Sequence, residues 1–380
     1  MKILVTVGIF PPDIGGPATF VPQLVNYLQN EHNYEIEILT LSENKNLKMK
    51  DELFVNRINR NLPLVYRWLT TILTIYKLGK NKDLIFVNGL GTETTIANFF
   101  LKKKIIRKIV GDPVWERAYK KAKTFETFDD FQVKNYGISI FVQKKIRNLS
   151  IKNSDIVITP SHHLKNFVIN LGYKNKIETI NNGVNIPKKT VKIFEHEQVN
   201  ITILSRLVAH KNIEKVIEAI SDLNDPLIKL NIVGEGPEVH QLKIISLKSG
   251  TKDNIVFHGK LGREEVNHIF LNSDIYIQAS NYEGLPHSLL EAMSFGIPVL
   301  CTPVGECIEI LANEDRGYML DLPVSKENIK SRVAGIISEK NLAAIKGQKG
   351  KDFVIKNYNI TNTFDRYKDI LAKLPEVENK

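Results

Sequence analysis

A chain of 380 residues, 43% of them hydrophobic, is long enough to bury substantial cores, and its length predicts about two domains. No apolar run reaches the roughly 18 to 20 residues of a membrane span. The opening stretch Met1–Val7 is too short and too strand-like for a signal peptide, so we expect a cytoplasmic protein.

The net charge of +10 indicates an anionic partner, which is nucleic acid, an anionic membrane surface or a phosphorylated ligand. The chain has two cysteines, Cys301 and Cys307, and both fall in its second half. We therefore expect neither a disulfide framework nor a tetrahedral metal site.

The chain opens with an apolar strand, Lys2–Val7, followed by a loop rich in glycine and proline and by a helix over about Ala18–Gln29. A strand, a glycine loop and a helix start favour close approach of a phosphate or a sugar. Gly15 and Gly16 lack the G-x-G-x-x-G spacing of dinucleotide folds, which disfavours NAD binding. The alternative is a plain turn between strand and helix.

Further strands are predicted at Glu35–Thr40, Asp83–Asn88 and Ile105–Val110, with helical patterns between them. This alternation predicts an α/β fold with a parallel sheet that is covered on both faces. In such sheets, ligands bind at the carboxyl ends of the strands.

The positive charge gathers in the first half of the chain, beside an apolar helix predicted within Leu62–Leu78. Cations with interleaved aromatic residues favour contact with an anionic membrane. The alternative is a buried helix beside a solvated lysine surface. Nucleic acid is disfavoured, because no known reader motif is present. The basic runs are Lys102–Lys104, Arg107–Lys108, Lys120–Lys123 and Lys144–Arg147.

Strands are predicted at Asp155–Ser161 and Lys176–Ile180, and the irregular stretch after Asn185 marks a domain boundary. The next strand is predicted at Asn200–Leu204. Arg206 and Lys211 follow its end, just before a helix predicted over Ile213–Leu223. A guanidinium fork and a lysine point charge can together neutralise a diphosphate. The alternative is that both cations are simply exposed to solvent.

Two further strands end in glycine turns, Ile228–Val233 before Gly234 and Ile255–Leu261 around Gly259. His258 lies in the second of these strands. A single histidine at a strand end without a partner favours a structural role.

A strand at Asp274–Ala279 leads through a tight loop into a helix that is predicted to start near Pro286. The first helical turn offers free N–H groups to an anion, and Glu283 lies beside it. Glu291 follows eight positions later, so the two carboxylates would reach different parts of one extended ligand, such as a nucleotide sugar. The alternative is an ordinary strand–helix unit with two solvated glutamates.

The run from Glu283 to Met293 resembles the Glu-x7-Glu signature of the retaining, family 4 glycosyltransferases (glycosyl transferases group 1), and so does Gly296–Gly305. The resemblance covers nearly the whole chain and is strongest from 200 to 310. It implies the GT-B fold, in which two Rossmann-like domains face each other across a cleft. Residues 1–185 would bind the acceptor and residues 186–359 the donor, and a helix over about 360–374 would pack back on the first domain.

The resemblance also implies the site residues. Glu283 would hold hydroxyls of the donor sugar and Glu291 those of the ribose, while Arg206 and Lys211 stabilise the leaving diphosphate. No metal or other cofactor is required, since the nucleotide diphosphate sugar is a substrate. The residues implied in donor binding are Gly15, Gly16, Arg206, Lys211, Gly234, Gly259, Glu283, Gly284, Leu285, Pro286, Leu289 and Glu291.

One position departs from the family pattern. Many members have a histidine near the sugar or the acceptor, where this chain has Gly111-Asp112. Asp112 is a candidate catalytic residue that would orient the acceptor hydroxyl or act as its base. An Asp before Pro is equally typical of a turn residue that is hydrogen-bonded to nearby backbone.

The resemblance implies retaining transfer of a hexosyl residue from a UDP- or GDP-sugar to a hydroxyl of a saccharide or a lipid-linked saccharide. The place would be cell-envelope polysaccharide or glycolipid synthesis, with the protein peripheral on the inner face of the membrane. The alternatives are a GT-B sugar epimerase or phosphorylase and a nucleotide-sugar-binding protein without turnover. The absence of an evident lysine cofactor site disfavours the phosphorylase.

Overall fold

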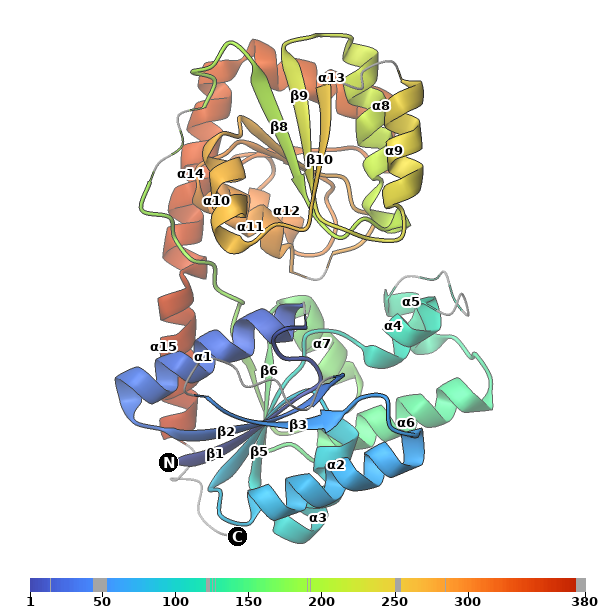
Figure 1. The fold of residues 1–380 in the computed structure, drawn as a ribbon, viewed down its shortest axis with the longest axis vertical. Helices are drawn as coiled ribbons and strands as arrows, with labels where there is room; N and C mark the ends of the chain where they lie inside the picture. The colour runs from blue at the N-terminus through green and yellow to red at the C-terminus, as the bar shows by residue number, and fades with distance from the viewer. Residues whose placement is uncertain are drawn as a thin grey trace. The chain divides into compact units, whose positions relative to one another are not determined.

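The computed structural model of the protein describes residues 1–13, 15–43, 53–120, 124, 126, 128–189, 191, 193–249, 254–283 and 285–373. It forms two compact units, an N-terminal unit of Met1–Asn181 with Phe364–Lys380 and a C-terminal unit of Asn182–Thr363. Each unit is a parallel β-sheet with helices on its two faces (Figure 1). The predicted α/β fold with two parallel-sheet halves is confirmed.

The N-terminal unit contains a seven-stranded parallel sheet in the order β3-β2-β1-β4-β5-β6-β7. The strands predicted in this half are confirmed, with ends that shift by at most two residues. Strand β3 was not predicted, because only Ile58 of its six residues is buried and its sequence lacks an apolar run. The strands are β1 (Lys2–Val7), β2 (Glu35–Ser42), β3 (Phe54–Asn59), β4 (Leu84–Asn88), β5 (Lys104–Lys108), β6 (Ile156–Thr159) and β7 (Lys176–Thr179).

Helices of the N-terminal unit pack on both faces of this sheet. Part of the last helix of the chain belongs here: Tyr27 Oη donates a hydrogen bond of 2.6 Å to Asp365 Oδ1, and the rings of Phe20 and Tyr367 lie 5.3 Å apart. The helices are α1 (Gly16–His32), α2 (Leu64–Gly79), α3 (Gly91–Leu101), α4 (Pro113–Lys120), α5 (Phe128–Val133), α6 (Ile138–Lys152), α7 (His162–Asn170) and, from Phe364 on, α15 (Ile360–Ala372).

The basic surface of this unit is smaller than the sequence indicated, because Arg107, Lys108 and Arg147 are buried. Lys108 Nζ lies 3.1 Å from the ring centroid of Phe20, and burial lowers the pKa of this ammonium well below its usual value. The guanidinium of Arg107 donates to Ser154 Oγ at 2.8 Å. These three cations therefore do not contribute to a membrane-facing charge.

Part of the predicted basic run Lys120–Lys123 lies outside the described residues, and nothing is described of the Lys120 side chain. The apolar helix predicted within Leu62–Leu78 is confirmed as α2, and it is partly exposed as expected. Among the helices of the described ranges, none is both long and apolar enough to cross a bilayer.

The C-terminal unit contains a six-stranded parallel sheet in the order β10-β9-β8-β11-β12-β13. Its central strands are buried on both faces: Ile201 and Ile277 pack into one hydrophobic cluster, and Tyr276 packs into another. Continuous burial of this kind is typical of parallel sheets between helices. The strands are β8 (Val199–Leu204), β9 (Ile228–Val233), β10 (Ile255–Gly259), β11 (Ile275–Gln278), β12 (Val299–Cys301) and β13 (Tyr318–Met319).

The helices of the C-terminal unit follow the strands in turn. Helix α8 has the bounds predicted for it, and its apolar stripe, which includes Val216 and Ile220, packs into the core beside β8. The helices are the short 3-10 helix η1 (Ala209–Lys211), α8 (Ile213–Leu223), α9 (Val239–Lys248), α10 (Arg263–Leu271), α11 (His287–Ser294), α12 (Cys307–Leu311), α13 (Lys326–Ser338) and α14 (Lys340–Tyr358).

Candidate active site

The order of the C-terminal sheet reverses at β8, which has β9 on one side and β11 on the other. Because β8 and β11 pair in parallel, their carboxyl ends lie at the same edge of the sheet. Helix α8, which follows β8, packs into one hydrophobic cluster, and helix α11, which follows β11, packs into another. Such a reversal of strand order is where ligands bind in open parallel sheets. A small pocket lies there, and its lining includes Ser205, Lys211 and Ser280. Loop 205–212 and the described residues of loop 279–286 therefore define the candidate site.

Lys211 and Glu283, which come from these two loops, form an ion pair between Nζ and Oε1. Ser280 Oγ donates a second hydrogen bond to the same carboxylate oxygen at 2.6 Å. The side chains of Lys211 and Glu283 are 17% and 13% exposed, so this pair is screened less than a surface pair. The structure thus brings together two of the predicted catalytic residues, 72 positions apart in the sequence.

Hydrogen bonds tie the two loops to each other. The side-chain amide of Asn212 donates to Ala279 O and to Asn281 Oδ1, each at 2.7 Å. The backbone N–H of Asn281 donates to His210 O at 2.8 Å. These bonds fix the spacing between Lys211 and Glu283. Asn212 and Asn281 were not predicted; the left-handed φ of 51° at Asn212 suits asparagine, but the sequence gives no sign of its partners.

Arg206 is exposed at the end of β8. The charges of Arg206, Lys211 and Glu283 all influence the pKa of the His210 imidazole. These four side chains therefore lie close to one another. Burial is the largest effect, and with Lys211 it lowers the pKa of the His210 imidazole. His210 is therefore neutral at pH 7. It is a site residue that the sequence did not reveal, because a histidine between two cations carries no recognisable pattern.

The predicted glycines Gly234 and Gly259 join the ends of β9 and β10, where Gly234 N donates to Gly259 O at 2.8 Å. A Cβ on Gly234 would lie 1.9 Å from the carbonyl oxygen of Ser205, and its φ of +133° is strained for other residues. Gly259 also has a positive φ, +67°. Glycine at position 234 lets the end of β9 lie against the loop that carries Arg206.

Helix α11 begins at His287, which confirms the predicted start near Pro286. Pro286 is the N-cap rather than the first helical residue, because its ψ of 78° is not helical. The first helical hydrogen bond runs from Leu290 N to Pro286 O, so the N–H groups of residues 287–289 have no partner within the helix.

The side chains of two predicted donor-binding residues pack into the core. Leu289 is wholly buried in a hydrophobic cluster, and Leu285 packs against the same cluster. Because the Leu289 side chain has no exposed surface, a contact of this residue with the donor would use its backbone. Gly284 lies outside the described residues.

Glu291 lies on the second turn of α11, where its Oε1 pairs with Arg263 Nη1 at 3.1 Å and with His287 Nδ1 at 3.6 Å. Burial raises the pKa of the Tyr276 hydroxyl, and the charges of Glu283 and Glu291 both raise it further. The charges of the two carboxylates therefore both act on this one buried group. Arg263, at the start of α10, was not predicted as a site residue.

Three predicted residues lie in the N-terminal unit. Gly15 is the N-cap of α1, and its φ of +150° favours glycine. Gly16 is the first residue of α1, and a Cβ there would meet no atom within 4 Å. The space beside Gly16 is therefore open, whereas a Cβ on Gly15 would lie 2.7 Å from Ile9 Cδ1. The third residue is Asp112.

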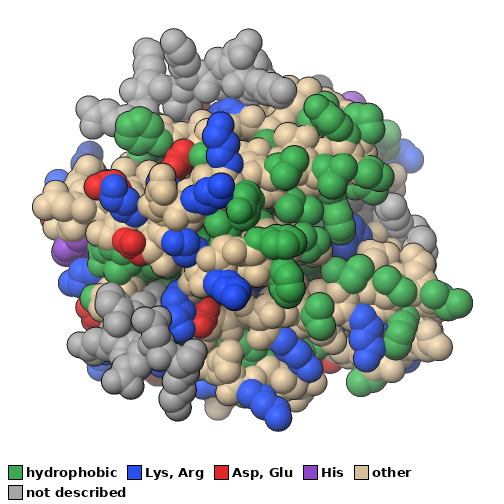
Figure 2. Space-filling model, turned by 90° about the horizontal axis from the view of Figure 1, so that it is seen from below, with side chains coloured by type: hydrophobic (Ala, Val, Ile, Leu, Met, Phe, Trp, Pro, Cys, Tyr) green, Lys and Arg blue, Asp and Glu red, His purple; other side chains and the backbone are tan. Residues whose placement is uncertain are grey.

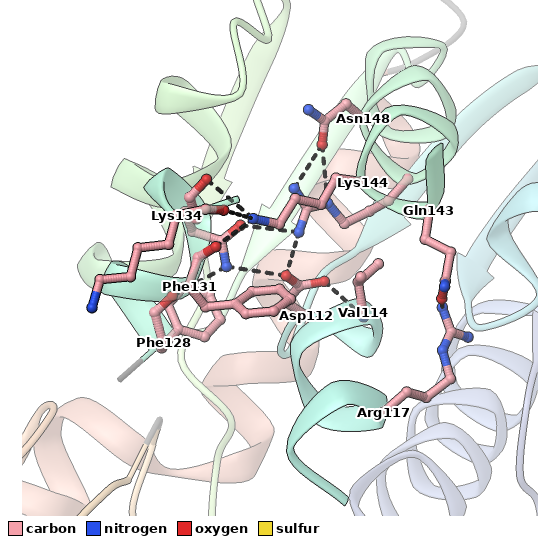
Figure 3. A network of polar contacts seen from close by, with 11 residues as sticks. Asp112, Val114, Arg117, Phe128, Phe131, Lys134, Gln143, Lys144 and Asn148 are labelled. Atoms are coloured by element: carbon pink, nitrogen blue, oxygen red, sulfur yellow. Dashed lines mark hydrogen bonds and ion pairs between the residues drawn. The ribbon is translucent and has the colours of Figure 1, made fainter. Parts of the chain in front are cut away.

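The structure corrects the role of Asp112, whose side chain is wholly buried. Its Oδ1 accepts the N–H of Val114 at 2.9 Å, and its Oδ2 accepts hydrogen bonds from Gln132 Nε2 at 3.1 Å and from Arg147 Nη1 (Figure 3). The carboxylate thus ties the start of α4 to α5 and α6. A buried carboxylate held in this way cannot reach an acceptor hydroxyl, so the catalytic prediction is wrong, and Asp112 is the turn residue of the alternative.

Side chains suited to metal binding do not gather among the described residues: no group of three or more His, Cys, Asp or Glu is placed to hold a metal ion. Cys301 and Cys307 are buried and free. A hydrogen bond with Cys307, together with burial, raises the pKa of the Cys301 thiol well above its usual value, so it stays protonated at neutral pH.

Comparisons with known proteins agree on one class. The sequence profile of the family "Glycosyl transferases group 1" matches residues 186–353. An uncharacterized glycosyltransferase of Methanocaldococcus jannaschii is 27% identical, over 98% of this chain and 99% of its own length. The Escherichia coli UDP-Gal:alpha-D-GlcNAc-diphosphoundecaprenol alpha-1,3-galactosyltransferase is 22% identical, over 83% of this chain and 82% of its own.

Solved structures of the same fold match nearly the whole chain. Sucrose-phosphate synthase of Thermosynechococcus elongatus has a TM-score of 0.80 at 15% identity, over 99% of this chain and 100% of that one. HepE of Anabaena, in complex with UDP and glucose, has a TM-score of 0.78 at 16% identity, over 98% and 100%. These likenesses show the GT-B fold.

Proposed function

We propose that this glycosyltransferase, whose residues 186–353 match the glycosyl transferases group 1 family, moves a hexosyl residue from a UDP- or GDP-sugar to a hydroxyl of a saccharide or lipid-linked saccharide, with retention at the anomeric carbon. The observation that carries the proposal is the Lys211–Glu283 pair, held beside Arg206 where β8 and β11 end. This arrangement offers cations to a diphosphate and a carboxylate to sugar hydroxyls.

The cations act on the leaving group. When the bond between the anomeric carbon and the diphosphate oxygen breaks, its electron pair stays on that oxygen and negative charge grows there. Lys211, Arg206 and the positive N-terminal end of helix α11 then stabilise the transition state more than the ground state. The acceptor oxygen bonds to the anomeric carbon on the same face, and its proton passes to the departing phosphate oxygen.

Glu283 is assigned to holding the donor sugar rather than to forming a covalent bond with it. Its Oε1 already accepts from Lys211 and Ser280, and a carboxylate bound in this way is a weak nucleophile. Lys211 would thus orient Glu283 and also bind the diphosphate. Glu291 is assigned to the ribose hydroxyls, with Arg263 and His287 keeping its carboxylate in place.

Replacing Glu291 by glutamine is expected to raise the KM for the donor about tenfold, because charged hydrogen bonds are stronger than neutral ones by roughly 1.4 kcal/mol. The turnover number should stay within about twofold, since the ribose binds alike in the ground and transition states. Glu309→Gln, at an exposed position of α12, is the matched control. A lost turnover number at an unchanged KM would contradict this role and place Glu291 in the chemical step.

The proposed acceptor class is lipid-linked, and the proposed place is the inner face of the cell membrane. The support is the relative whose name specifies a diphosphoundecaprenol acceptor. Transfer assays with a lipid-linked saccharide and with the same saccharide free in solution test this. The anomeric configuration of the product, measured by NMR, tests retention. Transfer to the free saccharide alone would remove the membrane part of the proposal, and an inverted product would remove retention.

A further inference from the structure

One surface of the N-terminal unit is unusually apolar. Helices α2, α3 and α6 lie side by side, with α3 in the middle, and α2 and α3 cover the core of the sheet. Of the 26 large hydrophobic side chains that are exposed in the described part of the chain, 14 lie on these three helices. This apolar face comprises Leu64, Val65, Tyr66, Trp68, Leu69 and Leu73 on α2, Ile96, Phe99 and Phe100 on α3, and Ile138, Phe141, Val142, Ile146 and Leu149 on α6.

The exposed residues follow helical spacing, so they form stripes rather than scattered points. Val65, Leu69 and Leu73 recur every four residues on α2, and Ile138, Val142 and Ile146 do so on α6. Figure 2 views the molecule from the side of α2 and α3, where hydrophobic side chains gather with lysines and arginines among and around them. Monomeric soluble proteins rarely expose contiguous apolar surface of this kind unless it binds something.

The charge of the three helices has one sign. Glu93 is their only acidic residue, and it is partly buried. Exposed lysines lie on the helices or directly after them. They are Lys77, Lys80, Lys102, Lys145 and Lys152. The face therefore combines apolar side chains with cations and lacks exposed acidic side chains.

Two of the lysines lie against aromatic rings of the same surface. Lys80 Nζ is 4.7 Å from the ring centroid of Tyr76, and Lys145 Nζ is 5.3 Å from that of Phe141. Phe99 and Phe100 are 76% and 68% exposed, and their rings meet edge to face at 5.2 Å. Lysines whose stems cover aromatic surface while their charge stays in water are typical of membrane interfaces.

We propose that the apolar face of α2, α3 and α6 docks the protein on an anionic lipid bilayer, with the apolar side chains inserted shallowly and the lysines against the headgroups. Both halves of the surface match this partner, because a bilayer offers apolar and negatively charged groups together. A second copy of the chain fits less well, since a symmetric contact through this face would bring lysines against lysines with no exposed acid to pair them. This surface would bring the proposed activity to the membrane. The proposal depends on the proposed function only for the idea that the acceptor is membrane-bound.

The test is co-sedimentation of the full chain with vesicles of phosphatidylcholine alone or with about one third phosphatidylglycerol. Wild type should bind the anionic vesicles about tenfold more tightly, and Lys77→Gln/Lys80→Gln/Lys145→Gln should lose most of this preference, as should wild type at high salt. Leu69→Ser/Leu73→Ser/Phe99→Ser should lower binding at least about tenfold. These side chains are exposed, so the fold should not change.

The matched control is Ile244→Ser/Leu247→Ser/Ile345→Ser, which removes three exposed apolar side chains of the C-terminal unit and should bind like wild type. The proposal is overturned if wild type ignores anionic vesicles or if both serine triples bind alike. It is also overturned if sedimentation velocity shows a dimer that the face variant abolishes while vesicles have no effect. Nucleotide-sugar binding, measured on the same samples, reports on the proposed function separately, because vesicle binding needs no donor.

Discussion

Lys211→Met is expected to lower the rate of glycosyl transfer about a thousandfold. The lysine is only 17% exposed and is held by Glu283, so its charge is already in place when the diphosphate leaves. Removing one preorganised stabiliser of developing charge costs roughly 3 to 4 kcal/mol in the transition state. Methionine keeps the length and apolar stem of lysine without its charge. The measurement is kcat/KM with a single donor, together with a thermal unfolding scan.

Lys243→Met is the matched control, because Lys243 is an exposed lysine on α9 of the same unit. It should transfer at the wild-type rate. The fold-loss of rate in Lys211→Met/Glu283→Gln should be smaller than the product of the two single fold-losses, because the two residues act as one unit. Unchanged turnover in Lys211→Met with an intact fold would show that this charge plays no part in the reaction.

Arg147→Met is expected to destabilise the protein by about 3 to 5 kcal/mol, because it leaves the carboxylate of Asp112 buried without a counter-charge. Arg147 and Asp112 are 8% and 0% exposed, and the carboxylate joins α4, α5 and α6 (Figure 3). Denaturant unfolding measures the loss. Replacing both residues, as Asp112→Leu/Arg147→Met, should recover part of it, because neither charge of this buried pair is then left without its partner.

The control for this loss is Lys145→Met, an exposed position on the same helix, which should change the free energy of unfolding by less than about 0.5 kcal/mol. A variant of Asp112 distinguishes a structural role of this side chain from a catalytic one. If Asp112→Asn unfolds like wild type but has lost turnover, the side chain acts in the reaction and its assignment to a purely structural role is wrong.

Local sequence patterns were sufficient for most of the fold. Apolar runs such as Ile228–Val233 mark buried parallel strands, and glycine turns mark their ends. Strand β3 was not predicted, because most of its residues are only partly buried. The proximity of Lys211 to Glu283 depends on the order of strands in the sheet, which no local pattern contains, and only the family resemblance predicted it.

The errors have a common physical origin in contacts between distant residues. Asp112 looked available for catalysis because its partner Arg147 lies 35 positions later. Lys108 looked like surface charge because the rings that surround it come from Phe20 and from Tyr367 near the end of the chain. Arg263 was overlooked because Glu291 lies 28 positions away on another helix. A side chain's own neighbourhood in the sequence does not determine its burial.

The most direct test of the central claim is a binding and hydrolysis screen of the purified protein against UDP-, GDP- and ADP-sugars, with Lys211→Met and Glu283→Ala alongside. One UDP- or GDP-sugar should bind and be hydrolysed slowly by wild type, and both variants should lose hydrolysis because the charge and the carboxylate at the ends of β8 and β11 are gone. If no nucleotide sugar binds wild type, or if both variants hydrolyse the donor as wild type does, the assignment of this site is contradicted.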